Sequence, residues 1–223
     1  MMPARGTRLS LYLIRHGQTE WSLSGQHTGR TDIPLTAQGE DEARALNPWL
    51  TRIQFARVLT SPRQRARRTC ALVGLAPQAE VEPDLAEWDY GDYEGMLSSD
   101  IRIKRPGWNV FRDGCPGGEM PEQVSARADR LIATLDTMDG NVALFSHGEF
   151  GLALTVRWIG LPVTEGQHFL LGTASLSILS YNPAHPEVRV IALWNATPAF
   201  LASGDGMRRR EGRAQGGRQS LSD

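Results

Sequence analysis

The sequence predicts an α/β fold in which short apolar strands alternate with amphipathic helices. Residues 9–14 are apolar at every position but one, as in a strand of a sheet that is covered on both faces. Residues 141–145 form a second run of this kind, and residues 121–137 carry apolar side chains at helical spacing. Because 223 residues with 40% apolar content can bury a substantial core, we expect one catalytic domain over residues 1–202.

Two helix starts follow from local capping signals. Thr36 is expected to cap a helix whose apolar positions continue to Leu50. Pro48 should end or kink this helix near its carboxyl end, because proline lacks the N–H that the helix needs. Ser61 and Pro62 are expected to be the cap and the first position of the next helix.

The other elements are expected from apolar runs between glycine, proline and polar residues. Strands are expected over residues 55–60, 81–85, 174–181 and 188–193, and helices over residues 62–73, 98–104 and 150–159. The segments expected to be irregular are residues 18–35 and 106–121. Residues 203–223, rich in Gly, Arg, Ser and Gln, are expected to be a disordered tail.

Composition and charge narrow the classes of function. A formal net charge of −1 argues against a dedicated nucleic-acid binder, whose domain is normally basic. The apolar run at residues 9–14 is too short for a membrane span or a signal peptide. Cys70 and Cys115 have neither metal-pair spacing nor the density of a disulfide framework. We therefore expect a reduced, cytoplasmic protein with no nucleic-acid or membrane partner, and a homodimer is left open.

Arg15, His16 and Gly17 come directly after the first predicted strand. In open α/β sheets, ligands bind at the carboxyl edge of the strands. The guanidinium of Arg15 matches the geometry of a phosphate group, His16 can act as a nucleophile or proton carrier, and Gly17 lets backbone approach a ligand closely. For this stretch alone, the alternative is a strand end that carries a surface arginine and histidine.

Arginines gather where the helix over residues 62–73 begins. A helix N-terminus already favours anions, because its first N–H groups are free and its dipole is positive there. We expect Arg65 to contribute to an anion site. For Arg63, Arg67 and Arg68, a solvated basic face is the favoured interpretation.

Residues 87–95 combine acidic and aromatic side chains between glycines, a pattern typical of a loop that lines a pocket. Aromatic walls raise the pKa of a carboxyl group and so prepare it as a proton donor. Most of the four carboxylates in this segment are nevertheless expected to be surface charges. The run 141–145 is followed by Ser146, His147 and Gly148, just as the first strand is followed by Arg15, His16 and Gly17.

If these strands are neighbours in one sheet, one edge collects Arg15, His16, Arg65, Glu87 and His147. Phosphoryl transfer needs such a set, because its transition state spreads negative charge over the equatorial oxygens. A histidine nitrogen can form a phosphohistidine, while a carboxylic acid protonates the departing alkoxide and then, as carboxylate, activates water. This chemistry requires no metal, and the sequence shows no convincing set of metal ligands.

The motifs occur in the order found in the histidine phosphatase superfamily, the phosphoglycerate mutase-like group, which the chain resembles over residues 9–193. They are Arg15-His16-Gly17-Gln18-Thr19-Glu20-Trp21, Thr28-Gly29, Leu35-Thr36 with Gly39, Ser61-Pro62 to Arg65-Ala66 and Thr69, Glu87 with Tyr90-Gly91, and Ser146-His147-Gly148. The resemblance implies a three-layer α/β/α fold with a mixed, mostly parallel central sheet.

The resemblance also implies roles for individual residues. The implied catalytic residues are the nucleophile His16, the proton donor Glu87 and the phosphate-pocket residues Arg15, Arg65 and His147. The implied substrate-binding residues are Gly17, Ser22, Thr28, Gly29, Tyr90 and Gly148. The implied partner is a small phosphorylated metabolite, with no metal or cofactor. The histidines that match no catalytic position, and for which we expect structural or surface roles, are His27, His168 and His185.

Departures from the mutase pattern favour hydrolysis. Residues 96–120 are shorter and less basic than the mutase insertion, and Ser22 and Glu149 stand where mutases usually carry asparagine. The motifs are most similar to a phosphatase subgroup that includes fungal sedoheptulose-bisphosphatase and actinobacterial broad-specificity acid phosphatases. Sugar phosphates or bisphosphates are therefore the expected substrates. A carboxylate at Glu149 is expected to repel a phosphate group unless it points away.

Two alternatives to the phosphatase stay open at this point. One is a phosphoglycerate mutase that depends on 2,3-bisphosphoglycerate. The other is a module that binds a phosphate ligand without turnover. The complete set of His16, Arg15, Arg65, Glu87 and His147 argues against the second, since a binder needs neither a nucleophile nor a proton donor.

Overall fold

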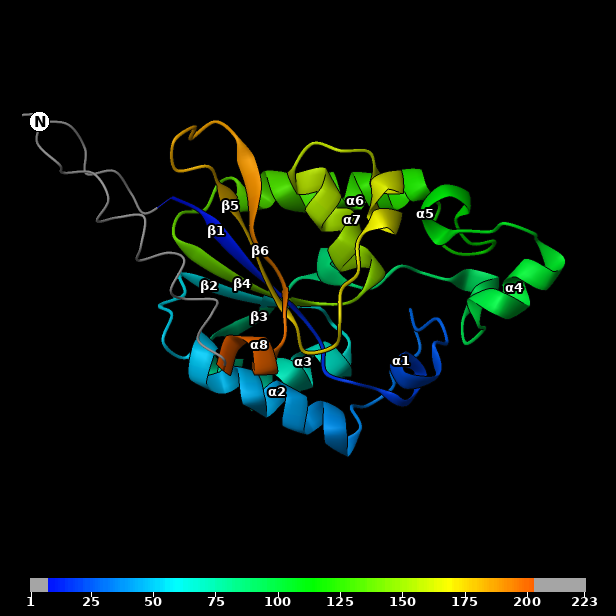
Figure 1. Ribbon diagram of the computed structural model, residues 1–223, viewed down its shortest axis with the longest axis horizontal. Coiled ribbons are helices and arrows are strands. Elements are labelled where there is room, and N and C mark those ends of the chain that lie inside the picture. Colours follow the sequence, from blue (N-terminus) through cyan, green and yellow to red (C-terminus); the bar gives the residue numbers. More distant parts are fainter. Residues whose placement is uncertain (1–7, 203–223) are drawn as a thin grey trace, which may run out of the picture.

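The computed structural model describes residues 8–202 of the chain and places six strands in one sheet (Figure 1). The strands are β1 (Ser10–Arg15), β2 (Arg57–Thr60), β3 (Ala79–Val81), β4 (Asn141–Ser146), β5 (Leu176–Tyr181) and β6 (Arg189–Ala196). Their order is β3-β2-β4-β1-β5-β6, in which the first four are parallel and β5 and β6 pair antiparallel with their neighbours. This confirms the mixed, mostly parallel sheet. The predicted tail, residues 203–223, lies outside the described residues.

Helices connect the strands on both sides of the sheet. The α-helices within residues 8–202 are α1 (Glu20–Ser24), α2 (Ala37–Leu50), α3 (Gln64–Leu72), α4 (Ser98–Lys104), α5 (Val110–Asp113), α6 (Pro121–Leu135), α7 (Glu149–Trp158) and α8 (Pro198–Ala202). Short 3₁₀-helices lie at Ala76–Gln78, Pro83–Leu85, Gly91–Tyr93 and Val163–His168. In this part of the chain, none of the helices has the length and apolar character that crossing a membrane requires.

The sheet is buried on both faces because successive side chains of a strand point to opposite sides. Leu11 and Leu13 of β1 belong to one core cluster, to which α6 and α7 contribute. Tyr12 and Ile14 belong to the other, to which α2 and α3 contribute. Figure 1 shows these helix pairs on opposite sides of the sheet, which makes the predicted three layers.

Several predicted elements are confirmed closely. The Thr36 hydroxyl caps α2 by accepting a hydrogen bond from the Gly39 N–H (3.0 Å). This helix ends at Leu50, two residues after Pro48, as expected for a proline in the last turn. The predicted helix over residues 98–104 is α4.

Some predicted boundaries are wrong, among them that of the strand predicted after residue 80 and the start of α3. The strand expected over residues 81–85 ends at Val81, because Pro83 lacks the N–H that a strand needs for its ladder and begins a 3₁₀-helix instead. Helix α3 begins at Gln64 rather than Pro62. The Ser61 hydroxyl accepts from the Arg63 N–H (3.3 Å) just before the helix and lies 2.7 Å from His147 Nε2.

Both segments predicted to be irregular contain a short helix. In residues 18–35, Thr19 caps α1, and its hydroxyl accepts a hydrogen bond from the Ser22 N–H (3.1 Å). In residues 106–121, Asn109 caps α5 by accepting from the Phe111 N–H (2.9 Å). Such caps are sequence signals, so both helices could have been predicted.

The carboxyl ends of β1, β4 and β2 meet at one edge of the sheet. The register of β1 and β4 sets Arg15 beside Ser146, so the two His-Gly pairs leave the sheet side by side. The His16 N–H donates to the Ser146 carbonyl (3.1 Å), and the Ser61 N–H, just beyond β2, donates to the Phe145 carbonyl (2.9 Å). The convergence of these strand ends is therefore confirmed.

Candidate active site

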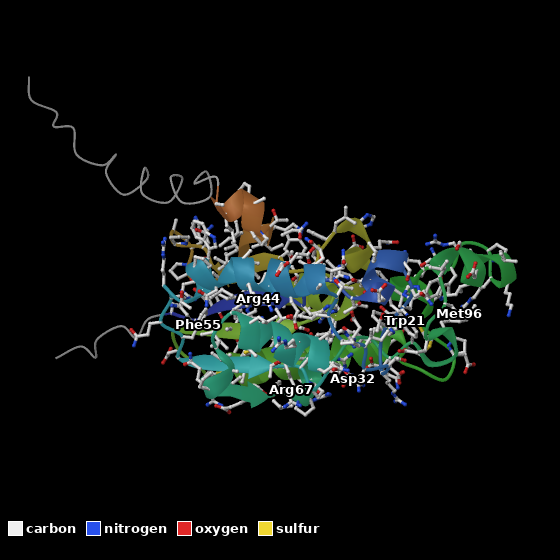
Figure 2. All side chains as sticks on the ribbon, turned by 90° about the horizontal axis from the view of Figure 1, so that it is seen from below. Trp21, Asp32, Arg44, Phe55, Arg67 and Met96 are labelled. Carbon is white, nitrogen blue, oxygen red and sulfur yellow. The ribbon has the colours of Figure 1, made fainter. Side chains whose placement is uncertain are left out.

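A pocket of about 190 Å³ opens at this edge. The predicted site residues that line it are Arg15, His16, Ser22, Thr28, Glu87 and Tyr90. Trp21 of α1 also lines it and lies at the opposite end of the molecule from Phe55, which precedes β2 (Figure 2). The pocket therefore sits at the carboxyl end of the parallel strands, where the sequence predicted it.

The orientation of the His16 ring follows from one hydrogen bond. Its Nδ1 lies 2.8 Å from the Gly17 carbonyl oxygen, which can only accept, so Nδ1 carries the proton. Burial holds the pKa of His16 well below its ordinary value, and the charges of Arg65 and Arg15 lower it further. The ring is therefore neutral at physiological pH, and Nε2 holds the free lone pair.

His147 lies beside His16, with 5.2 Å between the ring centroids. Arg65 Nε donates to His147 Nδ1 (3.2 Å), so the ring proton is on Nε2 and points to the Ser61 hydroxyl. Burial, followed by the charge of Arg65, holds the pKa of His147 well below its ordinary value. His147 is thus a neutral, oriented ring behind the pocket wall.

Arg65 is fully buried and is bound to the protein along most of its guanidinium. Besides His147, it donates to the carbonyl oxygens of Thr28 (2.9 Å), Gly29 (3.2 Å) and Thr31 (3.1 Å). These bonds fix the segment that carries Thr28 into the pocket. Arg65 and His147 do not themselves line the pocket that the structure describes, although they border the residues that do.

Arg15 supplies the guanidinium group that lines the pocket. One of its terminal N–H groups donates to the Leu171 carbonyl, while its buried Nε has no hydrogen-bond partner among the described residues. A buried donor without a partner costs free energy unless a ligand satisfies it. This arrangement fits an anion bound beside His16.

Most of the motif glycines allow another backbone segment to pack closely against them. A methyl group added at Gly17 would lie 2.1 Å from the Gly39 carbonyl oxygen, and one at Gly29 would lie 2.5 Å from the Trp88 carbonyl oxygen. At Gly148 it would lie 3.3 Å from Arg15 Cζ. Gly17 and Gly29 therefore position loops, whereas Gly148 leaves room for the guanidinium of Arg15; none of the three lines the pocket.

Glu87 holds the N-terminus of α7. Its Oε1 accepts from the N–H groups of Trp88 (2.8 Å) and Phe150 (2.7 Å), and its Oε2 from those of Gly148 (2.9 Å) and Glu149 (3.2 Å). Burial raises the pKa of Glu87 to about 7, and the charge of Glu149 adds to this rise. The N–H donors of Trp88 and Phe150 and the charge of Arg65 oppose it. The group can therefore carry or release a proton near neutral pH.

Two of the pocket residues outside the predicted site bear on its chemistry. Glu149 lines the pocket, so it does not point away. His27, for which a structural or surface role was expected, stacks on Tyr90 with 4.5 Å between ring centroids and lines the pocket. The sequence offered a signal for each, because Glu149 follows the His147-Gly148 motif and His27 directly precedes the Thr28-Gly29 motif.

Two other carboxylates of residues 87–95, those of Glu94 and Asp89, have different roles. Glu94 accepts from the N–H groups of Gly29 and Thr31 (both 2.9 Å to Oε1) and so fixes the same loop as Arg65. Asp89 pairs with the exposed Arg30 (2.6 Å). No three His, Cys, Asp or Glu side chains within residues 8–202 are grouped as a metal site would need.

The other arginines of α3 face a second, larger groove of about 620 Å³ beside β3. Arg68 pairs there with Glu40 (2.8 Å), and Arg67 is exposed (Figure 2). None of the predicted site residues lines this groove. The interpretation as a solvated face is confirmed for Arg67 and Arg68, but not for Arg63, which is half-buried and whose Nε is buried.

Comparison with known proteins agrees with this geometry. The family model of the histidine phosphatase superfamily (branch 1) matches residues 11–195. An acid phosphatase of Mycobacterium tuberculosis is 40% identical over 198 residues, which cover 87% of this chain and 97% of the relative. Sedoheptulose 1,7-bisphosphatase of Saccharomyces cerevisiae is 38% identical over 187 residues, which cover 69% of this chain and 68% of the relative.

A solved structure leads to the same assignment. The product of a Mycobacterium tuberculosis open reading frame superimposes with a TM-score of 0.79 at 40% identity, covering 85% of this chain and 98% of that one. Family match, identity and fold thus agree over nearly the whole described chain. The chain belongs to the histidine phosphatase superfamily, branch 1, and is an enzyme that hydrolyses phosphate monoesters.

Proposed function

We propose that this phosphatase transfers the phosphoryl group of a small phosphorylated metabolite to Nε2 of His16 and then to water. The observation that carries the proposal is the bond from His16 Nδ1 to the Gly17 carbonyl, which leaves the Nε2 lone pair in the pocket that Arg15 and Glu87 line. Arg15 holds the phosphate oxygens. His147 and Arg65 are positioning residues that keep the neighbouring wall in place.

The two chemical steps balance with Glu87 as the proton carrier. In the first step, Nε2 attacks phosphorus, the bond to the leaving oxygen breaks, and the Glu87 carboxyl gives its proton to that oxygen. In the second step, the Glu87 carboxylate takes a proton from water while the water oxygen attacks phosphorus and the P–N bond breaks. Glu87 is then again protonated and His16 is again neutral.

Small sugar phosphates are the proposed substrate class. The pocket has room for a small leaving group, at about 190 Å³. One relative is a sedoheptulose bisphosphatase and another an acid phosphatase, which supports phosphorylated sugars over macromolecular substrates. Ser22 and Thr28 line the leaving-group side, although in the structure their hydroxyls donate to the Thr19 and Gln26 carbonyls.

The test is phosphate release from a panel of sugar phosphates, phosphoglycerates, phosphoserine and an aryl phosphate. We expect turnover of sugar phosphates at the same rate before and after dialysis against EDTA, because Arg15 and backbone donors supply the positive charge. A loss of turnover in EDTA that added divalent metal restores would contradict the metal-independent mechanism. Transfer of phosphate between phosphoglycerates without net release would favour a mutase.

The pKa of Glu87 predicts the pH dependence of activity. The proton-donating form is present below the pKa of about 7 and is lost as the pH rises through it, whereas His16 with its lowered pKa stays neutral well into the acid range. For alkyl phosphates, kcat/KM should therefore be highest below pH 7 and fall by about tenfold per pH unit above it. A profile of kcat/KM from pH 4 to pH 9 checks this, and a rise above about pH 7 would contradict it.

Two assignments beyond the reaction are also proposals. A cytoplasmic location is supported by the two cysteines, Cys70 and Cys115, which are free and buried in the structure, as in a reducing compartment. Burial raises the pKa of both thiols to about 12, so both are poorly reactive. The homodimer stays a prediction, which light scattering of the purified protein tests.

A further inference from the structure

Glu149 brings a second carboxylate into the catalytic pocket. It is the first residue of α7 and lies half-buried on the pocket wall. Its N–H donates to Glu87 Oε2 (3.2 Å). Burial raises the pKa of Glu87 and of Tyr90, and the charge of Glu149 raises both further, so its carboxylate lies close to these two pocket residues.

The charges that line the pocket are unevenly placed. Arg15 is the only lysine or arginine among the described residues that line it, and it lies directly before the nucleophile. The transferred phosphoryl group therefore meets Arg15, and the buried Arg65 adds positive charge beside the same residue, His16. Arg102 acts on the pocket residue His27, but its Nε donates to the Trp108 carbonyl and it does not line the pocket.

The leaving group consequently meets carboxylates and neutral donors without a cation of its own. A second phosphate or a carboxylate on the substrate would face Glu149, and like charges repel most strongly where little water screens them. A hydroxyl group would instead donate a hydrogen bond to the same carboxylate. His27 does not compensate, because burial lowers its pKa and leaves it neutral at physiological pH.

We infer that Glu149 sets the substrate class: it selects phosphate monoesters whose leaving group is an uncharged polyol and disfavours those that carry a second anionic group. The inference rests on the proposed function of the same pocket. By this preference the enzyme differs from bisphosphatases and from phosphatases of phosphorylated acids, whose substrates carry a second anionic group. The carboxylate of Glu149 then has a selective role in the pocket.

The experiment uses a matched pair of substrates. Glycerol 3-phosphate and 3-phosphoglycerate differ only at carbon 1, which is a neutral hydroxymethyl group in one and a carboxylate in the other. Wild-type enzyme should favour glycerol 3-phosphate in kcat/KM, and Glu149→Gln should reduce this preference by about tenfold. An altered pKa of Glu87 acts on both substrates alike and cancels in the ratio.

Glu20→Gln is the matched control, because it removes the same charge from an exposed position on α1. It should leave the ratio at the wild-type value, and both variants should keep the thermal unfolding midpoint. If the enzyme turns over neither glycerol 3-phosphate nor 3-phosphoglycerate, each is measured as an inhibitor of the hydrolysis of an aryl phosphate. The ratio of the two inhibition constants then replaces the ratio of the two kcat/KM values. A ratio that Glu149→Gln leaves unchanged would overturn the inference.

The wild-type enzyme decides the question even where a variant fails to fold. Equal or better use of 3-phosphoglycerate by the wild type would also overturn the selective role of Glu149. Failure of the proposed function looks different: the aryl phosphate would then not be hydrolysed, or its hydrolysis would survive replacement of His16.

Discussion

Replacing His16 with alanine should lower kcat/KM for every phosphate monoester by about 10⁴-fold or more, because the variant has no atom that can accept the phosphoryl group. The neighbouring His147 cannot take over: its Nδ1 accepts from Arg65 and its Nε2–H points to the Ser61 hydroxyl. The measurement is steady-state phosphate release together with acid-quenched labelling by a radioactive substrate. Wild-type enzyme should retain label on histidine and the variant should not.

The same substitution should leave the fold almost unchanged. His16 follows β1 rather than belonging to it, and its ring is bound to the backbone only through the adjacent Gly17 carbonyl. His168→Ala is a suitable control, because this side chain is 64% exposed and lies outside the pocket. It should keep full activity. Label retained by His16→Ala would show that a different residue is the nucleophile.

The sheet could be predicted from the sequence because its strands carry their own signal. Strands β1 and β4 are nearly continuous apolar runs, which only a sheet covered on both faces can bury. Each ends in a histidine and a glycine, so the rule that ligands bind at the carboxyl edge of parallel strands led to the right place. Strand β3 has no such signal: its three residues are half-buried or exposed, and its pairing with β2 defines it.

Six predicted residues line the pocket, but the burial of Arg65 and His147 beside it could not be predicted. The sequence predicts that Arg65 and His147 reach the edge, but each is buried by partners far away in the chain, such as the carbonyl of Thr28 and the hydroxyl of Ser61. Contacts of this kind depend on tertiary packing, which residue type and spacing do not encode. His27 enters the pocket for the same reason, through its stacking on Tyr90.

The close packing of the motif glycines was likewise hidden in the sequence. Gly17 appeared to serve approach of a ligand, whereas the structure uses it to bring the first loop against the first turn of α2 at Gly39. A glycine signals that something approaches the backbone, but not whether a ligand or another loop does so.

Glu87→Gln should affect substrates according to their leaving group. An alkyl phosphate releases a strongly basic alkoxide, so loss of the proton donor should lower kcat/KM by about 10²–10⁴-fold. An aryl phosphate such as p-nitrophenyl phosphate releases a stable phenolate that hardly needs the proton, and its loss in kcat/KM should be much smaller. The measurement is the ratio of the two kcat/KM values in wild type and variant, because kcat/KM reports the first step, whereas kcat also contains the hydrolysis of the phosphohistidine that both substrates share.

The ratio matters because Glu87 also has a structural role. Its two oxygens accept from three N–H groups at the start of α7 and from the N–H of Trp88. An amide nitrogen in place of one oxygen would face two of these donors and could not accept from them. Leaving such donors unsatisfied costs about 1–3 kcal/mol in the free energy of unfolding. Distortion of the pocket lowers kcat/KM for both substrates alike, whereas loss of the proton donor lowers it mainly for the alkyl phosphate.

Glu94→Gln is the matched control for this structural part. Glu94 also accepts backbone N–H groups, from Gly29 and Thr31, but it does not line the pocket. Its replacement should therefore lower stability and reduce the two kcat/KM values by the same factor. Equal losses of kcat/KM on alkyl and aryl phosphates in Glu87→Gln would show that Glu87 is not the proton donor and acts in the first step only by capping α7. The proton would then have to come from the other carboxylate in the pocket, that of Glu149.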